Sequence, residues 1–380
     1  MALKSWLSLI NFSRLTQDSS TLIRIYIGNE AGDLDSVVCA LAAAYASDTT
    51  RADDKIRHIP IMNFPRDHFR IKTECAFALR QFDISQEALL FLPDEVERLT
   101  ALFKDGRLEI ALVDHNNPVE ALGSMTSSIV LVLDHHQLIL PSRLPAEAEK
   151  IMKLVGSCSS IVSRWAREER GLSDPYPADL SRLLAQTMLI DTANFSPNQL
   201  VDDLDREEYE KVTLNLPEWN GDGEYDTIVQ ARFDITGLST RELLLKDAKF
   251  VPCANGKSIF ASTLHCDLRD FFHRENGWDE IDSFYLSAEA KGAELLLFMG
   301  TVSSGLNRGF GWYAPKMEDG FTSSFRAWQD TVESFQLGEY DSLPEMKVYA
   351  GARTITGSDG KVVSRKKAMP LLIPWFQATF

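Results

Sequence analysis

The first half of the chain alternates short apolar runs with longer segments of helical spacing. The apolar runs, which predict strands, are 22–27, 58–63, 88–92, 109–113 and 128–133. The segments of helical spacing between and after them are 37–46, 67–82, 94–104 and 177–190. Strands that are apolar throughout are typical of parallel sheets with helices on both faces. The pattern therefore predicts an α/β fold whose first domain is a doubly wound parallel sheet.

The second half mixes the two kinds of pattern less regularly, which predicts a smaller α+β domain with a mixed sheet. Its strand candidates are 258–264, 283–288, 294–299 and 347–350, and its helix candidates are 240–246 and 323–334. Between the halves, Asp202–Glu210 holds six carboxylates and is followed by the turn-rich EWNGDGEYD. We therefore expect domains over 1–200 and 227–380, joined by a linker over 201–226.

Composition narrows the function classes. A net charge of −16 over 380 residues argues against a general nucleic-acid binder, which needs a basic face. Five cysteines without CxxC spacing argue against a disulfide framework, so we expect a cytoplasmic protein. No apolar run approaches the roughly 20 residues that span a bilayer. The amphipathic start, MALKSWLSLINFSRL, predicts a packed helix and not a secretory signal.

Side chains that bind metals follow the predicted strands. Asn29, Asp33 and Asp35 follow the first strand, Asp114 follows 109–113, and Asp134-His135-His136 follows 128–133, while Asp191 ends a helical segment. One such aspartate alone would usually cap a helix. Ligands of α/β sheets, however, gather outside the carboxyl ends of the strands. Mixed carboxylates and imidazoles suit Mg²⁺ or Mn²⁺ better than structural zinc.

These motifs, in this order, resemble the DHH phosphoesterase superfamily. NEAGDLDS, VDHN, DHH and DTANF look like its four motifs, and VVSRKKAMP looks like the Ser-Arg-Lys segment of its DHHA2-type second domain. That domain is shared by family II inorganic pyrophosphatases, exopolyphosphatases and prune proteins. Four longer stretches, INFPRDHFR, VGSCSS, LIDTANF and LLLKDAKF, are similar to eukaryotic cytosolic exopolyphosphatase. The resemblance runs from about Leu22 to the C-terminus.

The resemblance implies an active site that binds two divalent metals, in the cleft between the domains. It makes Asp114 and Asp191 ligands of both metals, with Asn29 and Asp33 on one and Asp35 and His135 on the other. It puts His136 against the substrate phosphate, with Asp134 orienting a histidine. Catalysis would then rest on His136, Asp134 and Asp114. An asparagine at 29, where pyrophosphatases have histidine, favours Mg²⁺, although Mn²⁺ or Co²⁺ remain alternatives.

The resemblance further implies an exopolyphosphatase, in which a hydroxide shared by two metals attacks the terminal phosphorus. His136 favours retained catalysis, because prune proteins commonly lack it. Two alternatives stay open: a family II pyrophosphatase, and a prune-like phosphodiesterase or interaction protein. We expect a small phosphoanhydride substrate and a monomer. The basic residues we expect to bind its phosphates are Arg365, Lys366, Lys249, Arg308 and Arg66.

The segment Gly156–Ser160 is expected to begin a helix. Its serines predict an N-cap, and its backbone amides are candidates for contacting phosphate. Cys158 within it has no base at a suitable spacing and is expected to be structural.

Overall fold

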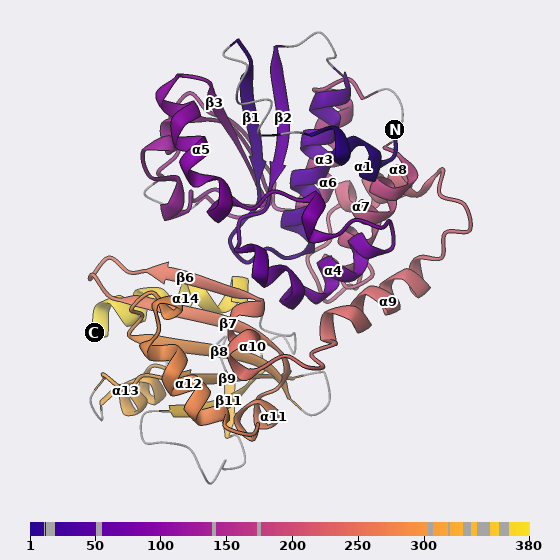
Figure 1. The fold of residues 1–380 in the computed structure, drawn as a ribbon. Coiled ribbons are helices and arrows are strands. Elements are labelled where there is room, and N and C mark those ends of the chain that lie inside the picture. The colour runs from indigo at the N-terminus through magenta and orange to yellow at the C-terminus, as the bar shows by residue number, and fades with distance from the viewer. Residues whose placement is uncertain are drawn as a thin grey trace. The chain divides into compact units, whose positions relative to one another are not determined.

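The computed structural model divides the chain into two compact units, Met1–Arg232 and Phe233–Phe380 (Figure 1). The residues that it describes are 1–10, 12, 20–50, 55–138, 142–172, 176–302, 307–317, 320–329, 336–339, 350–356 and 365–380. No helix in this described part is long and apolar enough to cross a membrane.

The first unit is built on a five-stranded parallel sheet in the order β2-β1-β3-β4-β5. Its strands are β1 (Leu22–Ile27), β2 (Ile56–Ile61), β3 (Leu108–Val113), β4 (Ile129–Asp134) and β5 (Glu149–Met152). Alternate residues of β1 enter two different hydrophobic clusters, Tyr26 one and Ile25 the other. Both faces of the sheet are therefore covered, which confirms the doubly wound α/β prediction.

Helices pack on each face. The helices of the unit are α1 (Leu3–Leu9), α3 (Leu34–Thr50), α4 (Thr73–Arg80), α5 (Leu92–Lys104), α6 (Cys158–Glu168), α7 (Ala178–Asp191), α8 (Asp203–Thr213) and α9 (Gly221–Phe233). The short helices η1 (Arg66–Ile71), η2 (Gln86–Ala88) and η3 (Glu120–Ser128) connect them. Helix α3 is buried along nearly its whole length because five alanines let α6 and α7 approach closely. The predicted packed leading helix is α1, which buries Trp6.

The second unit contains a six-stranded mixed sheet in the order β10-β11-β9-β8-β7-β6, as the sequence predicted. The strands are β6 (Ala248–Pro252), β7 (Ser258–Asp267), β8 (Leu295–Val302), β9 (Asn307–Tyr313), β10 (Gln336–Glu339) and β11 (Ala350–Thr356). The helices are α10 (Thr240–Lys246), α11 (Leu268–Phe272), α12 (Gly277–Leu286), η4 (Ala288–Ala290), α13 (Gly320–Gln329) and α14 (Arg365–Thr379). Only β7 and β8 pair in parallel.

Two strand predictions were wrong. Residues 283–288 belong mainly to α12, because Ile281, Phe284 and Tyr285 are buried at helical spacing. Of residues 88–92, Ala88 ends η2, Phe91 forms one isolated bridge with Met62, and Leu92 begins α5, which has Pro93 in its first turn. The predicted strand at 347–350 lies outside the described residues except for Ala350.

The acidic segment that we expected to be a linker is helical and lies within the first unit. Residues 201–226 form α8 and the start of α9. The buried carboxylate of Glu208 explains why, since Arg164 and Arg167 of α6 bind it at 3.3 and 2.6 Å. Burial acts to raise the pKa of Glu208, but hydrogen bonds from Arg167 and Lys211 outweigh it, so this pKa is lowered.

Glu208→Gln should therefore destabilise the first unit. We expect a loss of about 1–2 kcal/mol, because both arginines are partly exposed and can be rehydrated. A carboxyl with a lowered folded pKa contributes stability above its ordinary pKa and loses it as pH falls through the folded value. Urea unfolding should thus show a constant difference from wild type above about pH 4.5 that shrinks in stronger acid. A difference that grows below pH 4 would contradict this assignment.

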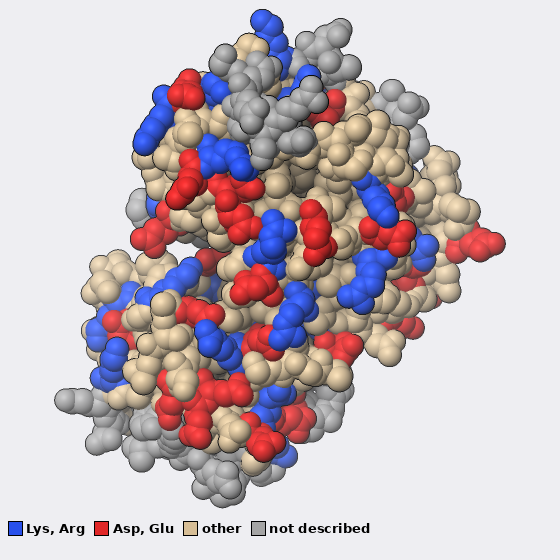
Figure 2. All heavy atoms as spheres, in the orientation of Figure 1, with Lys and Arg blue, Asp and Glu red and all other residues tan. Residues whose placement is uncertain are grey.

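The surface carries both signs of charge. Figure 2 shows acidic and basic side chains interspersed over the face that it draws. The excess of acidic residues in the sequence is thus not gathered at one place on this face.

Candidate metal centre

The candidate site lies where the strand order of the first sheet reverses. With β1 beside both β2 and β3, the carboxyl ends of β1 and β3 form the crevice where such sheets bind ligands. Asn29 follows β1 and Asp114 follows β3, and the Asn29 Nδ2 donates to Asp114 Oδ2 over 2.7 Å. The Ser36 hydroxyl donates to the same oxygen over 2.7 Å. The Asp114 carboxylate is therefore fixed from the first βα turn.

Asp114 itself has a left-handed backbone, with φ of 60°. This conformation is unfavourable for most residues, although aspartate tolerates it better than others. Such strain persists only where the surroundings enforce it, and it concentrates at functional sites. The turn brings the Asp114 carboxylate close to two histidines.

Asp114, His135 and His136 form a group whose ligand atoms all lie within 4.8 Å of one another. The His135 Nε2 is 3.2 Å from Asp114 Oδ1 and 4.0 Å from Asp35 Oδ2. Its other nitrogen, Nδ1, is 3.0 Å from the Val155 carbonyl oxygen. Because a carbonyl only accepts, Nδ1 must carry the proton.

The direction of the other ring nitrogen, Nε2, bears on whether a divalent metal fits among these residues. His135 thus turns Nε2 toward two carboxylates, which it can pair with as an imidazolium or, when Nε2 carries no proton, share with a bound cation. A backbone carbonyl that holds the second ring nitrogen is also the usual support of a metal-binding histidine. The three side chains are nearly buried, so water screens their charges little. The residues therefore fit a divalent metal.

Asp134 lies under His136. It is fully buried at the end of β4 and accepts hydrogen bonds from His136 Nδ1 over 2.7 Å and from Asn116 Nδ2 over 2.5 Å. Burial acts to raise the pKa of Asp134, but the hydrogen bond and charge of His136 outweigh it, so this pKa is lowered. The ionised carboxylate keeps the proton on His136 Nδ1 and leaves Nε2 for another partner.

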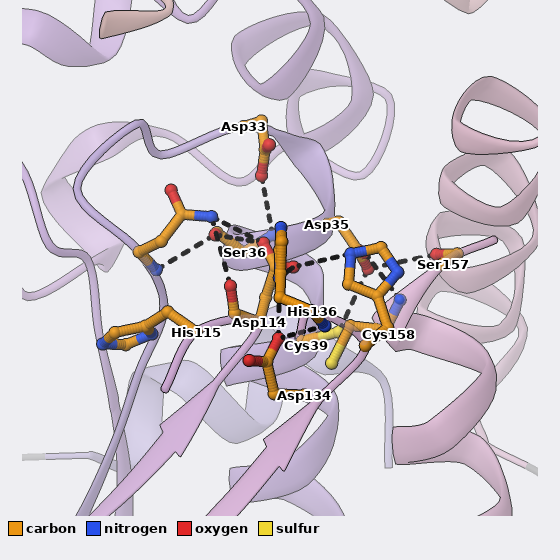
Figure 3. A network of polar contacts seen from close by, with 12 residues as sticks. Asp33, Asp35, Ser36, Cys39, Asp114, His115, Asp134, His136, Ser157 and Cys158 are labelled. Atoms are coloured by element: carbon orange, nitrogen blue, oxygen red, sulfur yellow. Dashed lines mark hydrogen bonds and ion pairs between the residues drawn. The ribbon is translucent and has the colours of Figure 1, made fainter. Parts of the chain in front are cut away.

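Asp35 is held by the start of α6. Its carboxylate accepts from the Cys158 amide over 2.7 Å and from the Ser157 hydroxyl over 3.2 Å (Figure 3). It also accepts from the amide and the hydroxyl of Ser159, over 2.9 and 2.8 Å. The predicted N-cap is confirmed, since the Ser157 side chain accepts from the Ser159 amide. The amides that the sequence offered to a phosphate thus bind Asp35. Burial raises the pKa of the Cys158 thiol to about 12, as suits a structural residue.

Three further residues expected to bind metal, Asn29, Asp33 and Asp191, are placed less directly for that role. The amide oxygen of Asn29 accepts from the Ala31 amide over 2.8 Å, so its nitrogen faces Asp114 and a ligand role would require rotation of the amide. Asp33 Oδ1 accepts from the Ser36 amide at the start of α3. Asp191 ends α7, before three consecutive residues of positive φ, Ala193–Phe195.

The chain is similar to several known proteins. A model of the DHHA2 domain matches residues 226–375. Exopolyphosphatase PRUNE1 of Mus musculus is 32% identical over 273 residues, which cover 70% of this chain and 58% of the relative. The Homo sapiens PRUNE1 is 28% identical over 380 residues, covering 97% of this chain and 78% of the relative.

A Methanococcus jannaschii protein of the family II inorganic pyrophosphatase type has the same fold, with a TM-score of 0.65 and 19% identity. The alignment covers 93% of this chain and 99% of that protein. The second part of the chain carries a DHHA2 domain, and the chain as a whole is similar to the PRUNE1 proteins. It spans less than two thirds of the mouse relative's length. The first unit, which contains the motifs that resemble the DHH superfamily, is called the DHH domain below, and the second unit, which contains most of the DHHA2 match, is called the DHHA2 domain.

The basic residues expected to bind substrate are less well defined. In the DHH domain, Arg66 donates to Asp94 over 2.8 Å and to the Gln86 carbonyl, and it stacks on Phe91. Contact with a phosphate would have to compete with these partners. In the DHHA2 domain, Lys249 is half-buried in β6. Arg308 lies in β9, and Arg365 and Lys366 begin α14, but these three side chains lie outside the described part.

Sequence reasoning missed several residues that hold this DHH site. Ser36 and Asn116 orient carboxylates directly, and both stand inside motifs that were recognised, NEAGDLDS and VDHN. The Val155 carbonyl left no signal, because its role is in the backbone.

Mn²⁺ should stabilise the protein through Asp114. At about 100 times its Kd, a metal that binds only the folded state adds about 2.7 kcal/mol. Asp114→Asn should remove most of the resulting rise in Tm, because a neutral amide is a poorer partner for the cation. Asp234→Asn, at an exposed aspartate of the other unit, should keep the full rise in a differential scanning calorimetry series. Equal shifts in both variants would exclude Asp114 as a ligand.

Proposed function

We propose that this chain is a phosphoanhydride hydrolase, an exopolyphosphatase that releases orthophosphate from the ends of linear polyphosphate in the cytosol. One observation carries the proposal: His135 is held by the Val155 carbonyl so that Nε2 points at Asp114 and Asp35, beside a second histidine oriented by Asp134. The printed names of the PRUNE1 relatives support the choice of substrate.

Two divalent ions are proposed at this site, Mg²⁺ first, with Asp35, Asp114 and His135 among the ligands. Asp33 and Asp191 are proposed to complete the set, and Asn29 is proposed to join it after rotation of its amide. When bound, the metals would lower the pKa of a shared water and neutralise charge on the attacked phosphate. The chain's own part is to hold these ligands in place, which the hydrogen bonds to Asp35 and His135 support.

His136 is proposed to face the attacked phosphate. Asp134 occupies the Nδ1 side of the ring, so Nε2 is the nitrogen that would face a phosphate, and it donates to a phosphate oxygen when the ring is an imidazolium. About a fifth of the His136 side chain is exposed, whereas Asp134 and Asp114 are almost wholly buried. His136 is therefore the least enclosed of the three side chains, although its Nε2 atom is itself buried.

Charge on the leaving phosphates would be neutralised by basic residues of the DHHA2 domain. Arg365 and Lys366 are the first candidates, followed by Lys249 and Arg308. An arginine pairs with two phosphate oxygens at once, and a lysine adds a mobile point charge. Arg66 is a weaker candidate because of its contacts with Asp94 and Phe91.

A substrate panel tests the proposal. Phosphate release should be measured from pyrophosphate, tripolyphosphate and long polyphosphate, with Mg²⁺ and with Mn²⁺. We expect release from the polyphosphates, and a loss of about 100-fold or more in kcat for His136→Asn. His273→Asn, at an exposed histidine of the second unit, should keep wild-type rates.

Each other outcome of the panel selects a different function. Activity confined to pyrophosphate would replace the proposal by a pyrophosphatase. Turnover of none of the three would refute hydrolysis and leave the interaction protein.

A further inference from the structure

The segment Val155–Ser160 touches two of the proposed metal ligands at once. The Val155 carbonyl accepts from His135 Nδ1, and the amides of Cys158 and Ser159 donate to Asp35. A shift of this segment would therefore turn the His135 ring and move the Asp35 carboxylate together. Whatever fixes the segment also fixes these two side chains.

One buried carboxylate, that of Asp205 in α8, holds the segment from behind. Its Oδ2 accepts from the Gly156 amide over 2.8 Å, and its Oδ1 accepts from the Ser157 amide over 3.3 Å and the Ser160 hydroxyl over 2.6 Å. Oδ2 also accepts from the Asp202 amide over 2.8 Å, within the capping box of α8. Asp205 has no exposed surface, so these bonds are not exchanged for water.

The segment is tightly enclosed at its one glycine, Gly156. A Cβ on Gly156 would lie 2.6 Å from Thr192 Cγ2, 2.8 Å from the Leu200 oxygen and 2.9 Å from Asp205 Oδ2. Gly156 is thus pressed against the residue that follows Asp191 as well as against Asp205. The backbone here is in close contact on several sides, and small changes at Asp205 should reach the site.

We propose that Asp205 is a positioning residue that sets the geometry of Asp35 and His135 through the segment Val155–Ser160. The inference rests on the proposed metal site and deepens it. Only a group with two acceptor oxygens satisfies all four donors. An amide at this position would turn N–H groups toward one pair of them.

The same helix supplies a matched control. Glu208 lies one turn after Asp205, is equally buried and also binds α6, but its partners are the Arg164 and Arg167 side chains. Within the described part of the chain, Glu208 bonds to the side chains of Arg164, Arg167 and Lys211, none of which belongs to Val155–Ser160. Glu208→Gln therefore loosens α8 from α6 without touching the segment.

The experiment measures Mn²⁺ affinity of the full chain by isothermal titration calorimetry, without substrate, alongside the Tm of the metal-free protein. Asp205→Asn should weaken Mn²⁺ binding about tenfold or more, the usual effect of losing support behind metal ligands. Glu208→Gln should lower the Tm while leaving the affinity within about twofold. This contrast separates positioning from general destabilisation.

Two results would overturn the proposal: wild-type affinity in Asp205→Asn, or an equal loss in Glu208→Gln. If Asp205→Asn does not fold, Ser160→Ala takes its place, since it removes one bond to the same carboxylate. A loss of about threefold supports the role, and unchanged affinity overturns it. Phosphate release is not part of this readout, so failure of the proposed hydrolase activity would be seen separately in the substrate panel.

Discussion

The hydrogen bond from His135 to the Val155 carbonyl is the interaction on which the rest of the site depends. It fixes a proton on Nδ1 and turns the other ring nitrogen, Nε2, toward Asp114 and Asp35. Two buried carboxylates and a buried imidazole therefore converge at the point where the strand order reverses, which is where such sheets bind their ligands.

Negative charge inside the DHH domain is managed in two different ways. Around Asp114 the acidic side chains converge at the candidate metal site. There Asp114 accepts hydrogen bonds from an amide and a hydroxyl, and Asp134 accepts one from an imidazole. Between α6 and α8 the acidic groups are already neutralised, Glu208 by arginines and Asp205 by backbone and hydroxyl donors. The second arrangement supports the first, because α6 begins with the residues that hold Asp35.

Much of the fold followed from the sequence. The apolar strands of the parallel sheet and the residues that follow them stood out because a doubly buried strand has a distinctive pattern. The acidic segment at 202–210 was expected to be part of a linker because a run of charged residues is usually solvated. The burial of Glu208 and Asp205 depends on tertiary contacts that the sequence does not show. The run at 283–288 was too short to separate strand from helix, and its burial against the second sheet decided the matter.

The candidate ligand residues could be picked out for a similar reason, since most of them stand in motifs at strand ends. Their supports could not, because a backbone carbonyl such as that of Val155 leaves no mark in a sequence. The role of Asn29 also depended on its surroundings. The Ala31 amide engages the oxygen that would otherwise be available to a metal.

The most direct test of the account is a crystal structure of the chain grown with Mn²⁺, with the ions located by anomalous scattering. The account predicts two peaks roughly 3.5–4 Å apart, the spacing of two-metal sites, with Asp114 in contact with both and His135 Nε2 with one. Peaks that leave Asp114 and His135 without a metal would contradict it.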